Sequence, residues 1–251
     1  GMVILKDNWE YDIFGIDNFN LDIKLSYYYN FIKQNINTIS GDILEVGVFQ
    51  GRSLLATALL LKKLKSNKKV YGFDSFSGFP PIFHEKDDFK NFKYLFEKGK
   101  ISEEQYLSHL KLLEYKNLIN KMNYTPKNIS SSGSFENTSY EIVMKKAEIL
   151  ELDNIVLIKG DFSETMKEDK FLQNKFMSVL IDCDIYSSYK ISLPFAWERM
   201  SNGAFMYIDE YFSLKFPGAK IACDEFFSNT SQKPKIISNI QGEFERWGIF
   251  K

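Results

Sequence analysis

The sequence has no long apolar run and little cysteine. It contains no stretch of the roughly 18 apolar residues that a transmembrane helix needs, and its first residues lack the basic-then-apolar layout of a signal peptide. Its two cysteines, Cys183 and Cys223, lie far apart and form no CxxC pair, which argues against a disulfide framework and a thiolate zinc site. We therefore expect a cytoplasmic protein with reduced cysteines and no membrane partner.

An excess of one charge is lacking too. The 32 lysines and arginines nearly balance the 33 aspartates and glutamates, which gives a formal net charge of -1. Without a strong global field to attract polyanions, a nucleic-acid partner is disfavoured. The apolar fraction of 44% and the charged fraction of 26% are typical of a folded globular protein.

Short apolar runs alternate with helical segments along most of the chain. Such alternation is typical of an α/β fold with a doubly wound, mostly parallel sheet. A turn at Gln241 and Gly242 near the carboxyl terminus predicts an antiparallel hairpin at the sheet edge. Residues 1–40 read as an amino-terminal helical extension, with leucine, tyrosine and isoleucine at helical spacing from Leu21 to Ile32, and residues 41–251 as the main domain. The predicted parallel strands are Ile43 to Val46, Val70 to Phe73, Ile155 to Ile158, Met177 to Ile181 and Ala204 to Ile208.

Residues 81–133 are too long for an ordinary strand-to-helix connection. The segment is charged and aromatic, and it includes a predicted helix from Ser102 to Asn120. We interpret it as an insertion, either a lid over the active site or a surface helix without a role in function. The polar run from Asn128 to Ser134 would act as its hinge, and Ser134 would cap a helix from Glu136 to Leu150.

Acidic residues follow the first three strands. In an open parallel sheet, ligands bind outside the carboxyl ends of the strands, so these positions are candidates for cofactor contacts. Gly47 and Gly51 allow a tight turn beneath a ligand, with Glu45 at its start. Asp74 could accept hydrogen bonds from ribose hydroxyls, and Asp161 could accept one from an adenine amine. Each acid taken singly could instead merely cap a helix.

A dinucleotide site is the obvious competitor, because the distance from Gly51 to Asp74 also suits a nicotinamide cofactor. The loop argues against it. Phe49 and Gln50 stand where backbone would need to approach a pyrophosphate closely. S-adenosylmethionine has no pyrophosphate and tolerates this bulk.

Four carboxylates follow the next two strands. Asp182 and Asp184 end the fourth strand, and Asp209 and Glu210 end the fifth. If these strands are neighbours, Asp182, Asp209 and Glu210 form a set of hard oxygen ligands suited to Mg²⁺ or Mn²⁺. A helix cap or a solvated turn is the alternative for each acid alone. Asp184 could be a fourth ligand, an orienting residue or the general base.

The two histidines, His84 and His109, both fall in the insertion. His84 lies near its start and is a candidate catalytic base or hydrogen-bond donor, although a lone loop histidine is more often simply exposed. His109 lies in the middle of the predicted helix and is a weaker candidate.

Five stretches, which span about Gly41 to Phe227, carry a resemblance to a known family: GDILEVGVFQGRS, VYGFDSFSGFP, IKGDFSET, LIDCDIYSSYK and GAFMYIDEYFSLKFPGAKIACDEFF. Together they resemble the macrocin O-methyltransferase family, which methylates sugars in macrolide biosynthesis. The family commonly has DGD where this chain has DCD, with Cys183 in the middle. It commonly has DDY where this chain has DEY, ending at Tyr211, so the third metal ligand is a longer carboxylate here. The insertion matches the family only loosely.

This resemblance implies a class I methyltransferase (Rossmann-like) fold with a seven-stranded sheet, S-adenosylmethionine as cofactor, and Mg²⁺. It implies metal ligation by Asp182, Asp209 and Glu210. The catalytic candidates are Asp182 and Asp184 at the end of the fourth strand, together with His84 in the insertion. The candidate cofactor-binding residues are Glu45, Gly47, Gly51, Ser53, Asp74, Ser75, Asp161 and Phe162.

The leading hypothesis is metal-assisted O-methylation of a sugar or a sugar-bearing metabolite. Methylation of a catechol-like compound is an alternative, because the same metal arrangement suits any chelating diol. A methyltransferase-fold protein that binds ligands without turnover is a third. By base rate and by the family we expect a homodimer.

Overall fold

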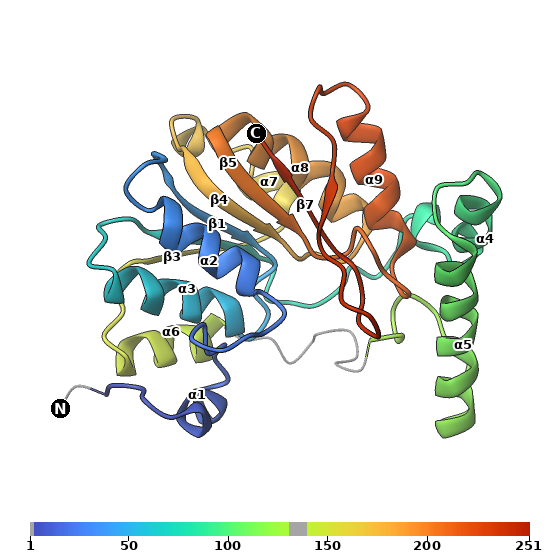
Figure 1. Ribbon diagram of the computed structural model, residues 1–251, viewed down its shortest axis with the longest axis horizontal. Helices are drawn as coiled ribbons and strands as arrows, with labels where there is room; N and C mark the ends of the chain where they lie inside the picture. The colour runs from blue at the N-terminus through green and yellow to red at the C-terminus, as the bar shows by residue number, and fades with distance from the viewer. Residues whose placement is uncertain (1–2, 131–139) are drawn as a thin grey trace.

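The computed structural model describes residues 3–130 and 140–251, which build a seven-stranded sheet with helices on both faces (Figure 1). The strand order is β3-β2-β1-β4-β5-β7-β6. The first five strands pair in parallel, and β7 pairs antiparallel with both β5 and β6. The strands are β1 (Asp42–Val46), β2 (Val70–Asp74), β3 (Ile155–Lys159), β4 (Phe176–Ile181), β5 (Met200–Ile208), β6 (Lys235–Ser238) and β7 (Arg246–Phe250).

Alternation along the strands sends side chains into two cores, one on each face of the sheet. Ile43 of β1 belongs to the core beneath α2, α3 and α6, whereas Leu44 belongs to the core beneath α8 and α9. Strand β5 divides in the same way, with Phe205 in the first core and Met206 in the second. The helices outside the insertion are α1 (Asn8–Phe14), α2 (Ser26–Asn35), α3 (Arg52–Lys63), α6 (Tyr140–Ile149), α7 (Phe162–Thr165), α8 (Tyr186–Arg199) and α9 (Pro217–Phe227), with a short 3-10 turn η2 (Asp169–Phe171).

Helix α2 is shorter than the sequence pattern from Leu21 to Ile32 predicts. It begins only at Ser26, and Leu21, which is 46% exposed, precedes it. The Ser26 hydroxyl accepts a hydrogen bond from the Ile23 amide at 2.8 Å, and this turn separates Leu21 from the helical face. The predicted parallel strands and the carboxyl-terminal hairpin are confirmed. The predicted hinge from Asn128 to Ser134 and the Ser134 cap fall largely or wholly outside the described residues.

The insertion contains α4 (Lys90–Glu97), α5 (Glu103–Ile119) and the 3-10 turn η1 (Glu85–Asp87). Both η1 and α4 pack on α9, and α5 packs on α4. The Gln105 amide nitrogen donates to the Ser213 carbonyl at 3.1 Å, and the His109 ring nitrogen lies 2.7 Å from the Leu214 carbonyl oxygen. These contacts fix α5 to the loop after β5, while the rest of α5 stands to one side of the sheet (Figure 1). None of the described helices combines the length and apolarity that a membrane span requires.

Candidate functional site

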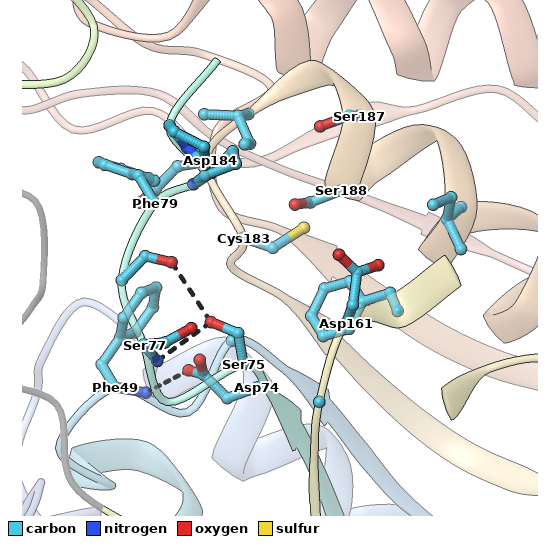
Figure 2. A pocket seen from close by; sticks show the side chains of 18 residues that line it. Phe49, Asp74, Ser75, Ser77, Phe79, Asp161, Cys183, Asp184, Ser187 and Ser188 are labelled. Carbon is cyan, nitrogen blue, oxygen red and sulfur yellow. Dashed lines mark hydrogen bonds between the residues drawn. The ribbon is translucent and has the colours of Figure 1, made fainter. Parts of the chain in front are cut away.

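A cavity of about 520 Å³ opens at the carboxyl ends of β1, β2, β3 and β4 (Figure 2). This is the sheet edge where the sequence predicts a cofactor. Of the eight candidate cofactor-binding residues, five line this cavity: Gly47, Asp74, Ser75, Asp161 and Phe162. Phe79 and Pro80 from the turn after β2, and Pro81 at the start of the insertion, add to the wall.

The loop after β1 is held by Asp74. One Asp74 oxygen, Oδ2, accepts hydrogen bonds from the Val48 amide at 2.7 Å and the Phe49 amide at 2.8 Å, and Oδ1 accepts from the Phe76 amide at 2.9 Å. Gly47 has a φ of 90°, and a β-carbon there would overlap the backbone carbonyl of Asp182. Asp74 therefore shapes the cavity floor, in addition to the ribose contact that the sequence predicts and that stays a prediction.

Asp161 stands on the opposite wall of the cavity (Figure 2). It is the N-cap of α7, and its Oδ1 accepts from the Ser163 amide at 2.8 Å and the Ser163 hydroxyl at 2.6 Å. These hydrogen bonds hold the pKa of Asp161 below its usual range. The carboxylate is exposed at the cavity wall and ionised, so it can accept a hydrogen bond from a ligand amine.

Glu45 lies beneath the loop and lines neither this cavity nor the next. It is fully buried, and its carboxylate accepts hydrogen bonds from the hydroxyls of Tyr28, Ser53 and Thr57 at 2.7–2.8 Å. Burial raises the pKa of Glu45, although the three hydroxyl donors oppose this rise. Glu45 thus anchors α2 and α3 beneath the site, where the sequence predicts a direct ligand contact. Gly51 is the N-cap of α3, with a φ of 82°.

A second cavity, of about 650 Å³, lies beside the first. Phe49 and Asp184 line both cavities, so the two share a wall. Ser53 lines the second cavity rather than the first. The second cavity also contains all four carboxylates that follow β4 and β5: Asp182, Asp184, Asp209 and Glu210.

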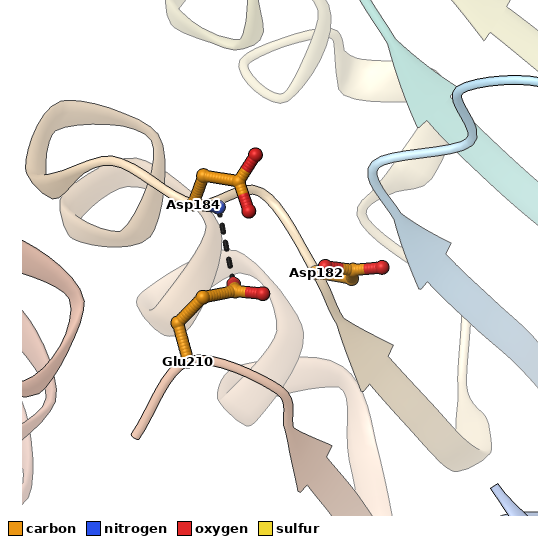
Figure 3. A group of neighbouring side chains, drawn as sticks. All are labelled: Asp182, Asp184 and Glu210. Carbon is orange, nitrogen blue, oxygen red and sulfur yellow. Dashed lines mark hydrogen bonds between the residues drawn. The ribbon is translucent and has the colours of Figure 1, made fainter. Parts of the chain in front are cut away.

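Three of these carboxylates form a compact group. One oxygen from each of Asp182, Asp184 and Glu210 lies within 4.8 Å of the others (Figure 3). Glu210 Oε1 accepts hydrogen bonds from the Asp184 amide at 3.1 Å and the Tyr189 hydroxyl at 2.6 Å. Asp184 adopts a φ of 63°, a left-handed conformation that costs free energy in a residue other than glycine. In this backbone conformation the Asp184 residue lies on the wall between the two cavities.

Burial and mutual repulsion dominate the electrostatics of this acidic group. Burial, followed by the charge of Asp209, raises the pKa of Asp182 well above its usual range and that of Asp184 to about 7. Burial and the charges of Asp182 and Asp209 likewise raise the pKa of Glu210. Ionised carboxylates packed in this way are destabilising unless a cation compensates them.

Asp209 borders this group and differs from its members in being paired with Lys24, whose ammonium lies 2.6 Å from Asp209 Oδ1. Burial opposes ionisation of Asp209, but the Lys24 charge outweighs it and lowers the pKa of Asp209 below its usual range. Lys215 lines the same cavity, and burial lowers its pKa. Sequence reasoning missed both lysines. Lys24 has no local signal because it meets Asp209 only through the fold, whereas Lys215 follows Glu210 closely enough to have been considered.

The residues present fit a divalent cation. The described group offers oxygen atoms only, which hard cations such as Mg²⁺ and Mn²⁺ prefer. Asp184 Oδ2 is buried and has no hydrogen-bond partner among the described residues. A buried acceptor without a donor costs free energy, and a bound cation would remove that cost. The compact group contains Asp184 in place of Asp209 from the predicted ligand set.

The histidines lie outside both cavities. His84 is exposed, and its Nδ1 accepts a hydrogen bond from the Lys86 amide at 3.0 Å, which caps η1. His109 is buried and stacks on Phe92 with ring centroids 3.8 Å apart. The structure therefore brings Asp182 and Asp184 together but does not bring His84 to them.

Comparisons with known proteins agree with this architecture. A family profile described as a methyltransferase domain matches residues 44–211. The O-methyltransferase NovP has 18% sequence identity and a TM-score of 0.60, over 89% of this chain and 78% of that chain. The calicheamicin methyltransferase CalS11 has 19% identity and a TM-score of 0.60, over 89% of this chain and 77% of that chain. Among curated protein sequences, none matches significantly.

The profile covers about two thirds of the chain, including the ends of all five parallel strands and both shared-wall residues, Phe49 and Asp184. The solved structures share the fold, and this chain has the seven-stranded sheet of a class I methyltransferase, in which β7 runs antiparallel to its neighbours β5 and β6. The chain therefore belongs to the methyltransferase-domain family, as a methyltransferase of the class I, S-adenosylmethionine-dependent fold.

Proposed function

We propose that the chain is a divalent-metal-assisted O-methyltransferase that methylates a hydroxyl of a sugar or a sugar-bearing metabolite. One observation carries the proposal. Two cavities share the wall formed by Phe49 and Asp184, one at the ends of β1 to β3 and the other containing the carboxylates after β4 and β5. A methyl donor in the first cavity would meet an acceptor in the second at this wall.

The first cavity suits S-adenosylmethionine in its shape and polarity. Phe49 and Phe162 give it aromatic surface, while Asp74 and Asp161 present carboxylates from opposite walls. These acids match the hydrogen-bond donors of a nucleoside, namely ribose hydroxyls and an adenine amine. In the loop after β1, Phe49 and Gln50 stand where a pyrophosphate-binding loop needs small residues.

Asp182, Asp184 and Glu210 would hold the cation. When bound, it supplies a Lewis acid that lowers the pKa of an acceptor hydroxyl and orients that hydroxyl. The local charge supports one such ion. In the second cavity Lys24 is paired with Asp209 and Arg52 with Asp17. The carboxylates of Asp182, Asp184 and Glu210 then face only Lys215 and Arg246 among the cationic lining residues, which leaves one negative charge when all are ionised.

The chemistry balances in one displacement. The acceptor oxygen forms a bond to the methyl carbon as the bond from that carbon to the sulfonium breaks, and the hydroxyl proton leaves. We assign the proton to the Asp184 carboxylate oxygen that does not hold the cation, because Asp184 belongs to the wall that the two cavities share. Tyr189 and the Asp184 amide hold Glu210 in place through their hydrogen bonds to its Oε1.

The sugar acceptor rests on the sequence resemblance, with a structural relative as a pointer. One CalS11 structure, with 18% identity and a TM-score of 0.52 over 87% of this chain and 76% of that chain, is described as a TDP-rhamnose 3'-O-methyltransferase. The second cavity is wide and polar enough for a hydroxylated ring, with Ser53, Ser213 and Arg246 on its walls.

Methyl transfer from S-adenosylmethionine to a panel of glycosides and nucleotide sugars, with Mg²⁺ or with EDTA, tests the proposal. We expect transfer to a sugar hydroxyl that EDTA abolishes and Mg²⁺ restores. Asp182→Asn and Asp184→Asn should each lower the rate by about 100-fold or more, while calorimetry shows little change in S-adenosylhomocysteine affinity.

Asp153→Asn is the matched control, because Asp153 is exposed and precedes β3 at the opposite edge of the sheet. It should behave as wild type. Equal rates with Mg²⁺ and EDTA would contradict the metal role. Transfer to catechols but to no sugar would contradict the acceptor class, and failure to bind S-adenosylhomocysteine would contradict the cofactor.

A further inference from the structure

A third cavity, of about 640 Å³, lies between the start of α2, the end of β5 and the β6–β7 hairpin. The third cavity adjoins the second, because four residues line both: Ile23, Lys24, Phe244 and Arg246. Among the described residues, none lines both the first and the third cavity. The order is therefore cofactor cavity, acidic acceptor cavity, third cavity.

The third cavity contains a polar group that the fold leaves unused. Tyr207 is 1% exposed, and its hydroxyl has no hydrogen-bond partner in the described part of the chain. The exposed Asn30 and the half-buried Ser238 also line this cavity. A buried hydroxyl without a partner costs free energy, and such groups in a cavity are typical of a site completed by a ligand.

The charges of the lining favour a neutral ligand. Asp22 and Glu243 balance Lys24 and Arg246, and Lys24 is already paired with Asp209. A diphosphate would instead need an excess of cationic groups. The second cavity, with its surplus of carboxylates, does not supply that excess either.

Two partly exposed aromatic rings complete the lining. Tyr27 is 38% exposed and Phe244 is 45% exposed. The Tyr27 ring packs on Phe205 with centroids 5.0 Å apart, and the Phe244 ring lies 5.6 Å from that of Phe212. Rings held in this way offer apolar faces to the C–H face of a pyranose, while neighbouring amide, hydroxyl and guanidinium groups bind its hydroxyls.

We propose that the third cavity is a subsite for a second sugar unit, so that the acceptor is an oligosaccharide whose methylated unit lies in the second cavity. This rests on the proposed function. The acceptor would extend from the carboxylates past Lys24 and Arg246, and the hydroxyls of Tyr207 and Ser238 and the Asn30 amide would bind the adjoining unit.

An array of immobilised mono-, di- and trisaccharides, probed with the protein in S-adenosylhomocysteine and Mg²⁺, tests the subsite. We expect a disaccharide to bind at least about tenfold more tightly than the monosaccharide that forms its terminal unit. Ser238→Trp, which fills the cavity, and Asn30→Ala should bring that ratio close to one. Thermal melting establishes that both variants are folded.

Ser231→Trp places the same side chain on the exposed turn before β6 and should keep the wild-type ratio. Tyr207→Phe removes one hydroxyl without changing the shape of the cavity and should lower the ratio. Equal binding of mono- and disaccharides, an unchanged ratio in Ser238→Trp, or no binding to any saccharide would overturn the subsite. A separate calorimetric titration of S-adenosylhomocysteine distinguishes the two proposals. If the protein binds S-adenosylhomocysteine and methylates a monosaccharide, but the cavity variants match wild type, the subsite alone is refuted.

Discussion

Asp87 links the insertion to the start of α8, and its burial has a measurable consequence. It lies in η1, is 0% exposed, and its Oδ1 accepts a hydrogen bond from the Tyr186 amide at the start of α8 at 2.8 Å. Its Oδ2 has no hydrogen-bond partner among the described residues. Burial raises the pKa of Asp87 from 3.8 to about 6, against the opposing effect of the Tyr186 hydrogen bond.

The sign of the pH dependence follows from this rise. The folded state holds the Asp87 proton more tightly than the unfolded state does. The stabilisation that the protonated carboxyl gives is therefore fully present below pH 4 and is lost as the pH rises through about 6. The full rise corresponds to about 3 kcal/mol of unfolding free energy. Asparagine keeps the acceptor for the Tyr186 amide and carries no charge. We expect Asp87→Asn to unfold at a free energy about 1–3 kcal/mol above wild type at pH 7.5, with the difference shrinking toward zero at pH 4.

Urea denaturation of both proteins from pH 4 to pH 7.5 measures this difference. Asp88→Asn is the control, because Asp88 is the exposed neighbour and should show no such trend. A difference between Asp87→Asn and wild type that stays constant across this range, or that grows toward acid pH, would refute the reasoning.

Two further substitutions test how the site is built. Gly47→Ala should lower the unfolding free energy by about 2 kcal/mol or more and weaken S-adenosylhomocysteine binding, because the added β-carbon would overlap the Asp182 carbonyl. The control is Gly99→Ala, which is also at positive φ but has open space around it and should lose less stability. Equal losses in urea denaturation would contradict this reasoning. In Glu45→Gln, an amide donor replaces one of the two oxygens that together accept hydrogen bonds from three hydroxyls, and we expect a loss of about 1–3 kcal/mol of unfolding free energy by the same measurement. Unchanged stability would show that this buried network is not a structural anchor.

Strand ends were predictable because the periodicity of a buried strand and the turn that follows it are local. Asp74 and Asp182 directly follow apolar runs, and only Lys159 and Gly160 separate Asp161 from one; a parallel sheet brings such positions to one edge. The methyltransferase fold was predictable for the same reason, together with motifs that span most of the sheet. The family profile confirms the methyltransferase domain.

The partners of each acid were not predictable, because they come from distant segments. Glu45 appears as a ligand contact in the sequence, but Tyr28 from α2 and two hydroxyls from α3 enclose its carboxylate. Lys24 reaches Asp209 across the sheet edge, and no local pattern announces that pair. The third cavity is also a product of tertiary packing, since α2, β5 and the hairpin all contribute to it.

The central claim is that a methyl donor and a divalent cation occupy adjoining cavities on either side of Asp184. Anomalous diffraction from crystals grown with S-adenosylhomocysteine and Mn²⁺ tests it without knowledge of the acceptor. We predict a manganese peak among the carboxylates of Asp182, Asp184 and Glu210, and adenosine between Asp74 and Asp161. Manganese elsewhere, or absent from this group while the nucleoside is bound, would contradict the account.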